Sequence, residues 1–360
     1  MRRTHSRTRQ AITRLSLAIV TVVTCHYSFA EIVVQQNSSS NANIAWSDAQ
    51  ASQFLSEDEP AAQVTTQVTT RTQPAQKSST IVLNNSTLAN KYPTSTSNYG
   101  NTSYSSYSSA QPDVNAKSAL VMDAQTGEVL YGKNVNTARP IASVTKLMTA
   151  VVIADARLDM SERITLQPID FAGAAGKNSS STLRAGDTLN RAEALLFALM
   201  KSENPAAAAL GRTYPGGKSA FVAAMNAKAR ELGMYSSQFA EATGLDPANR
   251  ASARDLGILV STASQYGLIR QFSTTASYDF NLGYRVLKSN NTNALVRNGG
   301  WNINLSKTGY INEAGRCVVM HTTLNSRPAV VVILGASSSQ SRTEDATRLM
   351  TWASQLPKRI

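Results

Sequence analysis

Apolar residues form strand-like runs near both ends of the segment that follows residue 113. The runs at 119–122 and 129–131 flank a Gln-Thr-Gly sequence at 125–127, and two runs around a short glycine-containing turn predict a hairpin. Two further runs, 317–323 and 329–334, have Asn-Ser-Arg-Pro between them. They predict a second antiparallel pair close to the end of the chain.

Between these runs, apolar residues recur at the spacing of helices. After Pro140, apolar residues recur at helical offsets, which predicts a helix with one buried face; they are Val144, Leu147, Met148, Val151 and Val152. A capping-box sequence, Asn190 with Glu193, predicts the start of the next helix. The later helices are expected over 191–200, 219–232, 252–265 and 341–355.

Strands at both ends with helices between them predict an α/β fold, in which an antiparallel sheet is flanked by helices and a helical lobe is added. The first hairpin can join the last strands in one sheet. We expect the first and last helices to cover that sheet and the central helices to form the lobe. A cleft between two lobes is a usual place for an active site.

The first thirty residues have a different pattern. Residues 1–14 hold five arginines and no acidic residue, residues 15–24 are uncharged and mostly apolar, and small residues stand at 28 and 30. This order predicts a secretory signal peptide over 1–30. Residues 31–113 are rich in Ser, Thr, Asn and Gln and bury too little apolar area to offset backbone entropy. We therefore expect a disordered tether over 31–113 and a folded domain over 114–360.

Charge and residue counts narrow the classes of function. The net charge of +12 suits an anionic partner such as nucleic acid, a membrane surface or another polymer. The predicted export, and the lack of segments in which basic and aromatic residues alternate, disfavour nucleic acid and favour another anionic polymer. Cleavage after Ala30 would leave one cysteine, Cys317, and one histidine, His321. No disulfide framework, metal site or cofactor is therefore expected.

One tetrapeptide suggests nucleophilic catalysis. Ser143-Val144-Thr145-Lys146 is the one Ser-x-x-Lys sequence in the chain, and residues three apart on a helix are neighbours. A serine hydroxyl needs a base to act as a nucleophile, and a lysine with a lowered pKa can be that base. Taken alone, such a tetrapeptide is expected about once by chance in a chain of this length.

Two other short sequences follow in order. Ser202-Glu203-Asn204 precedes Pro205, which predicts a turn between helices with Asn204 as N-cap. This turn would hold Ser202 and Asn204 in a rigid bend. The sequence 307–309, Lys-Thr-Gly, is expected where a strand begins, and its glycine can relieve crowding or let a ligand approach the strand edge.

The three sequences together resemble the signature of the penicillin-recognising serine peptidases and β-lactamases. The order, the spacing and the expected element types all agree, and the resemblance covers roughly residues 114–360 and includes 310–317. It is greatest with the low-molecular-mass D-alanyl-D-alanine endopeptidases of the bacterial cell wall. The resemblance implies a β-lactamase/transpeptidase-like fold, peptidoglycan stem peptides as substrate and β-lactam antibiotics as covalent inhibitors.

The resemblance also implies a catalytic role for the residues that match the first two motifs. Ser143 would be the acyl-ester nucleophile, and Lys146 would be its general base. Ser202 would relay a proton towards the leaving amine. Asn204 would hold both the substrate amide and the side chain of Lys146.

The residues that match the third motif would bind substrate. Lys307 and Thr308 would bind the substrate carboxylate beside Gly309. The backbone N–H groups of Ser143 and Tyr310 would form the oxyanion hole. Arg342 matches an arginine that helps to recognise the terminal carboxylate in this family. The alternative for Arg342 is a solvated residue in the first turn of the last helix, and the sequence leaves both open.

Two departures from relatives favour an endopeptidase. The Glu-x-x-Leu-Asn sequence of class A β-lactamases is missing, since 241–245 has the acid but not the pattern. Carboxypeptidases of this family usually add a C-terminal β-domain and an amphipathic membrane anchor, whereas 53 residues follow Lys307 here. We therefore expect a periplasmic D,D-endopeptidase without a stable membrane anchor. A D,D-carboxypeptidase is the first alternative, and a β-lactamase or a non-catalytic wall-binding protein are more distant ones.

Overall fold

The computed structural model describes residues 111–173 and 180–357, which all belong to one compact unit. The expected signal peptide and nearly all of the expected tether lie outside these residues. Val114, at the expected start of the domain, is the first buried residue of the described chain. None of the described helices is both long and apolar enough to cross a membrane.

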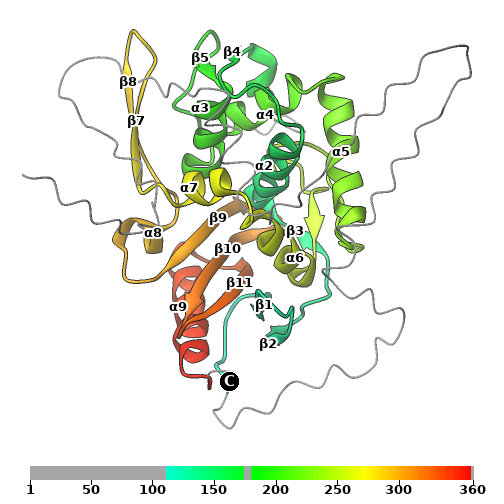
Figure 1. Cartoon of the computed structure of the whole chain (residues 1–360), viewed down its shortest axis with the longest axis vertical. Helices are drawn as coiled ribbons and strands as arrows, with labels where there is room; N and C mark the ends of the chain where they lie inside the picture. Colours follow the sequence, from blue (N-terminus) through cyan, green and yellow to red (C-terminus); the bar gives the residue numbers. More distant parts are fainter. Residues whose placement is uncertain (1–110, 174–179, 358–360) are drawn as a thin grey trace, which may run out of the picture. The chain divides into compact units, whose positions relative to one another are not determined.

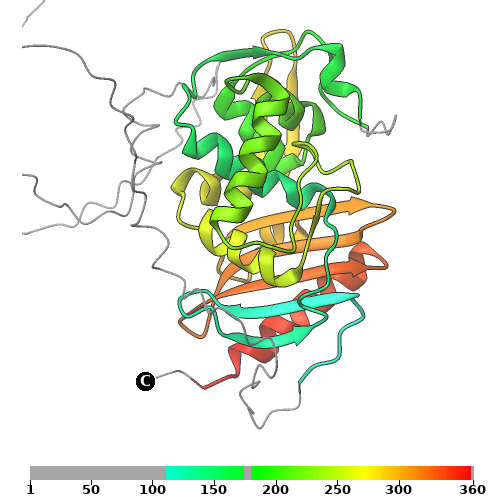
Figure 2. The same cartoon turned by 90° about the vertical axis from the view of Figure 1, so that its right-hand side faces the viewer.

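Strands from the two ends of the chain form one antiparallel sheet, as predicted. Its order is β2-β1-β11-β10-β9, and Figure 2 shows the strands from orange β9 to cyan β2. Their bounds are β1 Ser118–Asp123, β2 Val129–Lys133, β9 Ile303–Ile311, β10 Gly315–Leu324 and β11 Arg327–Ala336. In the central pair, Ser118 stands opposite Leu334 and Asp123 opposite Ala329. The sheet therefore depends on residues about two hundred positions apart.

Both faces of the sheet are covered, which explains the unbroken apolar run in β11. Side chains alternate between the two faces of a strand. Val331 and Ile333 pack with helix α9 (Ser339–Ser354) on one face, and Val330 and Val332 belong to the core shared with the helical lobe on the other. On that second face, helix α6 (Ala253–Ala263) packs against β1, β10 and β11, and helix α7 (Gly267–Thr274) packs against β9.

Apart from α8 (Ala294–Asn298), whose Leu295 packs with the α9 side of the sheet, the remaining elements form the helical lobe, drawn above the sheet in Figure 1. Its helices are η1 Ala142–Val144, α2 Thr145–Asp155, η2 Pro168–Phe171, α3 Arg191–Leu196, η4 Phe197–Lys201, α4 Asn204–Arg212 and α5 Gly217–Glu231. Three short antiparallel pairs complete it: β3 Arg139–Pro140 with β6 Arg250–Ala251, β4 Arg163–Thr165 with β5 Thr188–Asn190, and β7 Ser277–Asn281 with β8 Val286–Asn290.

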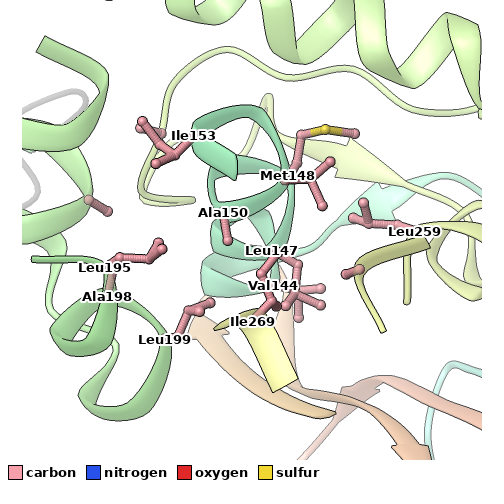
Figure 3. Packing of buried hydrophobic residues seen from close by; sticks show 14 of the residues in the cluster. Val144, Leu147, Met148, Ala150, Ile153, Leu195, Ala198, Leu199, Leu259 and Ile269 are labelled. Atoms are coloured by element: carbon pink, nitrogen blue, oxygen red, sulfur yellow. The ribbon is translucent and has the colours of Figure 1, made fainter. Parts of the chain in front are cut away.

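Helix α2 differs from the prediction in its surroundings. It is buried on every side from Thr145 to Ala154 rather than along one face. Helices α4, α5 and α6 pack around it, and Figure 3 shows Leu199, Leu259 and Ile269 on different sides of it. The prediction that this first helix covers the sheet is therefore wrong, because α6 and α7 occupy that face.

Some helix ends follow the sequence signals closely, and others are shifted by one or a few residues. Asn190 and Glu193 form the predicted capping box, in which the Asn190 side chain accepts from Glu193 N at 2.7 Å. The last helix begins earlier than predicted, because Ser338 rather than Ser341 is its N-cap. The Ser338 hydroxyl accepts a hydrogen bond from Ser341 N at 2.9 Å.

Candidate active site

The first motif places its hydroxyl and its amine side by side. A short helical turn, η1, leads directly into α2, so Ser143 and Lys146 lie on consecutive turns of one continuous helical segment. Lys146 Nζ lies 2.9 Å from Ser143 Oγ. The residue before the serine, Ala142, has φ of +49°, a conformation that costs free energy for a residue with a Cβ. The backbone thus bends sharply just before the nucleophile.

Burial gives Lys146 the properties of a base. Its side chain is completely buried, and Nζ also donates to Asn204 Oδ1 and to the carbonyl of Thr243, each at 2.6 Å. Desolvation lowers the pKa of Lys146 to about 7, although the carboxylates of Glu241 and Glu203 act in the opposite direction. At neutral pH a substantial fraction of Lys146 is therefore an uncharged amine, which can accept a proton from Ser143.

This pKa predicts how acylation depends on pH. Because the free amine of Lys146 is the active form, the second-order rate constant for acylation by a penicillin should rise with pH through a midpoint near 7. The rate of labelling by a fluorescent penicillin, measured between about pH 5 and pH 9, tests this. A rate that is constant or falls across this range would contradict the assignment of Lys146 as the base.

The second motif forms a strained turn that faces both lysines. The π-helical turn η4 ends at Ser202, which adopts a left-handed conformation with φ of +65°. Lys307 Nζ lies 2.8 Å from Ser202 Oγ. Asn204 was predicted as an N-cap but is the first residue of α4, with Glu203 in the cap position. This one-residue shift leaves the Asn204 side chain available to accept from Lys146.

The third motif lies within strand β9, at the edge of the sheet, rather than at the strand's beginning. Lys307 is completely buried, and its Nζ also donates to the carbonyl of Thr308 at 2.8 Å. Burial, together with the positive charges of Lys146 and Arg342, lowers the pKa of Lys307 well below its usual value. The hydroxyl of Thr308 donates to that of Thr292 at 2.7 Å. An incoming carboxylate would relieve the repulsion among these cations.

Gly309 has one of the two roles predicted for it, the relief of crowding. A Cβ on this residue would lie 3.0 Å from Ile141 O and from Ser143 N, so the missing side chain lets β9 lie against the backbone of η1. The protein's own backbone, rather than a ligand, makes this close approach. It brings the backbone of Gly309 and Tyr310 next to the N–H of Ser143, where an oxyanion hole would require it. The Tyr310 side chain is 46% exposed, and Arg316 lies over its ring at 3.6 Å from the centroid.

Arg342 is buried, which contradicts the alternative of a solvated residue. It lies in the first turns of α9 with 7% of its surface exposed. Burial and the neighbouring cations Arg316 and Arg297 lower its pKa, and its charge in turn lowers the pKa of Lys307. The two side chains therefore contribute to the same positive field.

One part of the site was not predicted from the sequence. The turn formed by residues 241–249 supplies the Thr243 carbonyl that accepts from Lys146, and Gly244 in this turn has φ of +83°. The Thr-Gly-Leu-Asp sequence at 243–246 does signal a turn. A turn signal does not reveal which distant side chain its carbonyl will contact, and so the sequence alone could not place this segment in the site.

Comparison with known proteins agrees with this geometry. The family described as D-alanyl-D-alanine carboxypeptidase matches residues 105–338. The chain belongs to this family. It is accordingly a serine-type D-alanyl-D-alanine peptidase, and the predicted antiparallel α/β fold and family resemblance are confirmed.

Individual relatives refine the comparison. The chain is 45% identical over 249 residues to a D-alanyl-D-alanine endopeptidase of Pseudomonas aeruginosa, covering 67% of this chain and 78% of the relative. It is 43% identical over 246 residues to one of Escherichia coli, covering 68% and 78%. Among solved structures, a Streptomyces DD-transpeptidase matches with a TM-score of 0.63 and 28% identity, covering 69% of this chain and 100% of that one.

Proposed function

We propose that this peptidase is a D,D-endopeptidase that hydrolyses D-alanyl cross-links of peptidoglycan through an acyl-enzyme. The single observation that best supports the proposal is the buried Lys146, with Nζ 2.9 Å from Ser143 Oγ and a pKa lowered to about 7. A nucleophile and a base in contact are the minimum for acyl transfer from an amide.

We assign a path to each proton of the acylation step from the contacts of the side chains. Ser143 Oγ attacks the carbonyl carbon of a D-alanyl residue while Lys146 takes the hydroxyl proton. The carbonyl oxygen becomes negative between the backbone N–H groups of Ser143 and Tyr310. As the C–N bond breaks, Lys146 gives up this proton and the leaving amine gains it by way of the Ser202 hydroxyl, which contacts Lys307, so that Lys146 is again an uncharged amine. Lys146 then takes a proton from the water that attacks the ester and passes it to Ser143 Oγ as the ester bond breaks, which releases the acid and restores Ser143.

Substrate recognition follows from the charges around β9. Lys307, the Thr308 hydroxyl and Arg342 would bind a carboxylate of the stem peptide, since all three lie in a region of positive charge. Asn204 would hold the substrate amide as well as Lys146. Within the part of the chain that the structure describes, β10 is the one strand paired with the edge strand β9, so an extended peptide can pair with the other edge of β9.

The endopeptidase assignment is supported by the level of similarity. The relatives named endopeptidase in P. aeruginosa and E. coli are 45% and 43% identical to this chain. A relative named endopeptidase in Haemophilus influenzae and relatives named carboxypeptidase in Bacillus subtilis and E. coli are each 31% identical. A D,D-carboxypeptidase is the alternative, because both reactions break a D-alanyl amide through the same acyl-enzyme. We also propose a periplasmic location, which rests on the pattern of residues 1–30.

A direct comparison of substrates tests this assignment. Purified protein should cleave a cross-linked muropeptide dimer faster than it removes the terminal D-alanine from a pentapeptide monomer, with products resolved by mass. The Ser143→Ala protein serves as the blank for both substrates. Removal of D-alanine without cleavage of the dimer would overturn the endopeptidase assignment and favour the carboxypeptidase.

A further inference from the structure

The turn at 241–249 is organised around one buried carboxylate. Glu241 is 7% exposed and accepts hydrogen bonds from Thr243 N at 2.5 Å, Gly244 N at 2.6 Å and Asn249 Nδ2 at 2.7 Å. Asn249 Oδ1 in turn accepts from Ala240 N at 3.0 Å. A carboxylate that binds the N–H groups two and three residues ahead fixes the path of a turn, so Glu241 determines where the carbonyls of this segment point.

Those carbonyls are directed at the helix that bears the catalytic pair. The Thr243 carbonyl accepts from Lys146 Nζ at 2.6 Å, and the Ala242 carbonyl accepts from the Thr149 hydroxyl at 2.8 Å. One residue further, a Cβ on Gly244 would lie 1.9 Å from the carbonyl oxygen of Ala142. The turn therefore touches the base directly and supports the backbone immediately before the nucleophile.

The charge of Glu241 has no cation paired with it. Its hydrogen-bond donors in residues 111–173 and 180–357 are backbone N–H groups and a neutral amide, and no lysine or arginine of these segments forms an ion pair with it. A buried charge that is stabilised by dipoles alone still acts on other charges nearby. The buried amine beside this turn is Lys146.

Other charged groups around Lys146 come from three further elements. Glu203, in the turn before α4, raises the pKa of Lys146 as Glu241 does, but Glu241 is the larger contribution. The carboxylate of Glu203 accepts from Ser181 and Thr182 rather than from the 241–249 turn. Lys307 on β9 is the neighbouring cation. At the far end of α2, Asp155 pairs with Lys228 of α5.

We propose that Glu241 is a positioning residue of the acylation reaction: its hydrogen bonds fold the turn that presents the Thr243 carbonyl to Lys146, and it places a negative charge in the turn that contacts this lysine. The inference rests on the proposed acyl-transfer function but does not depend on endopeptidase specificity. Glu241 touches neither substrate nor nucleophile. It acts through the backbone that it holds and through its electric field.

The pH profile of acylation by a fluorescent penicillin separates these two contributions. Glu241→Gln keeps an oxygen acceptor but loses the charge, so the midpoint of the acylation profile should move down by about 1 pH unit. Glu241→Asp keeps the charge, but its side chain is too short for the same hydrogen bonds. Its acylation profile should therefore keep the wild-type midpoint, while the acylation rate constant at the high-pH plateau should be lower by about tenfold. Either variant tests the proposal if the other fails to fold.

A matched control is available at the first hairpin. Asp123 is also buried, and its carboxylate also accepts from the N–H groups two and three residues ahead, Gln125 N and Thr126 N, each at 2.9 Å. Asp123→Asn therefore removes a buried turn carboxylate from outside the site, although this one is paired with Arg327, whose Nε lies 3.7 Å from Asp123 Oδ2. The midpoint of the acylation profile of this variant should equal that of the wild type.

The outcomes distinguish failure of this inference from failure of the proposed function. If the wild-type protein shows no adduct at any pH, acyl transfer by Ser143 is itself refuted. A wild-type midpoint near 7 that stays unchanged in Glu241→Gln would overturn the inference alone. An equal shift in Asp123→Asn would also overturn it, because the effect would then come from weakened folding in general. If the acylation rate constant of Glu241→Asp reached the wild-type plateau at high pH, the turn would not depend on the hydrogen bonds of this side chain.

Discussion

Ser143→Ala protein incubated with benzylpenicillin should keep its unmodified mass, whereas the wild-type protein should gain the mass of the intact antibiotic. Ser143 is the one hydroxyl in contact with Lys146 among the described residues, and a β-lactam opened by this hydroxyl remains attached as an ester. Removing a nucleophile of this kind reduces turnover by roughly 10⁴-fold or more. Intact-mass spectrometry measures the adduct directly.

Ser202→Ala is the matched control for this experiment. Its hydroxyl lies beside Lys307 instead of Lys146, so the variant should form the adduct at Ser143 more slowly but completely. Circular dichroism should show both alanine variants folded, since neither change opens a cavity larger than one oxygen atom. A full-size adduct on the Ser143→Ala protein would refute the assignment of the nucleophile.

Gly244→Ala should both destabilise the domain and nearly abolish acylation. The residue has φ of +83°, and the added methyl group would lie 1.9 Å from Ala142 O. Relief of this overlap requires either the 241–249 turn or the backbone before Ser143 to move. We expect a loss of about 3 kcal/mol in the free energy of unfolding and about a hundredfold in the acylation rate, because a displacement of roughly 1 Å at the nucleophile is enough for that.

Gly127→Ala separates backbone strain from this overlap. Gly127 has φ of +74°, close to that of Gly244, but no atom lies within 4 Å of the position that an added methyl group would take. The substitution should cost about 1 kcal/mol for the left-handed conformation alone and leave the acylation rate unchanged. Thermal unfolding followed by circular dichroism measures the loss of stability, and the rate of penicillin labelling measures acylation. Equal losses in the two variants would show that the contact with Ala142 does not matter.

The sequence was informative wherever a signal is local. The hairpin around Gly127, the capping box at Asn190 and the apolar runs of β10 and β11 depend on neighbours within a few residues, and the structure contains each of them. The three motifs were recognisable by their order and spacing. In the structure Lys146 contacts Ser143 and Asn204, Lys307 contacts Ser202, and the charge of Lys146 acts on Lys307.

What the sequence missed depends on contacts between distant segments. The apolar spacing of α2 indicated one buried face, but polar residues such as Thr149 are buried too because their hydroxyls find backbone carbonyls. The sequence left open whether Gly309 relieves crowding or admits a ligand, and only the contact with the distant η1 decides for the relief of crowding. The sequence could not decide whether Arg342 is buried, because the burial of a residue at the start of a helix depends on how that helix packs against the sheet beside it. Glu241 had no motif that marked it.

The position of β1 in the sheet has a consequence for how the chain folds during synthesis. β1 lies between β2 and β11, so its pairing on one side waits for a strand that ends at Ala336. Pairing across so long a separation is slow and comes late. The emerging chain therefore cannot complete its sheet until β11 has been made, and an unfolded chain of this kind suits the export predicted from residues 1–30. A chain truncated before β11 would contain the whole catalytic pair, but β1-β2 and β9-β10 would be two separate strand pairs.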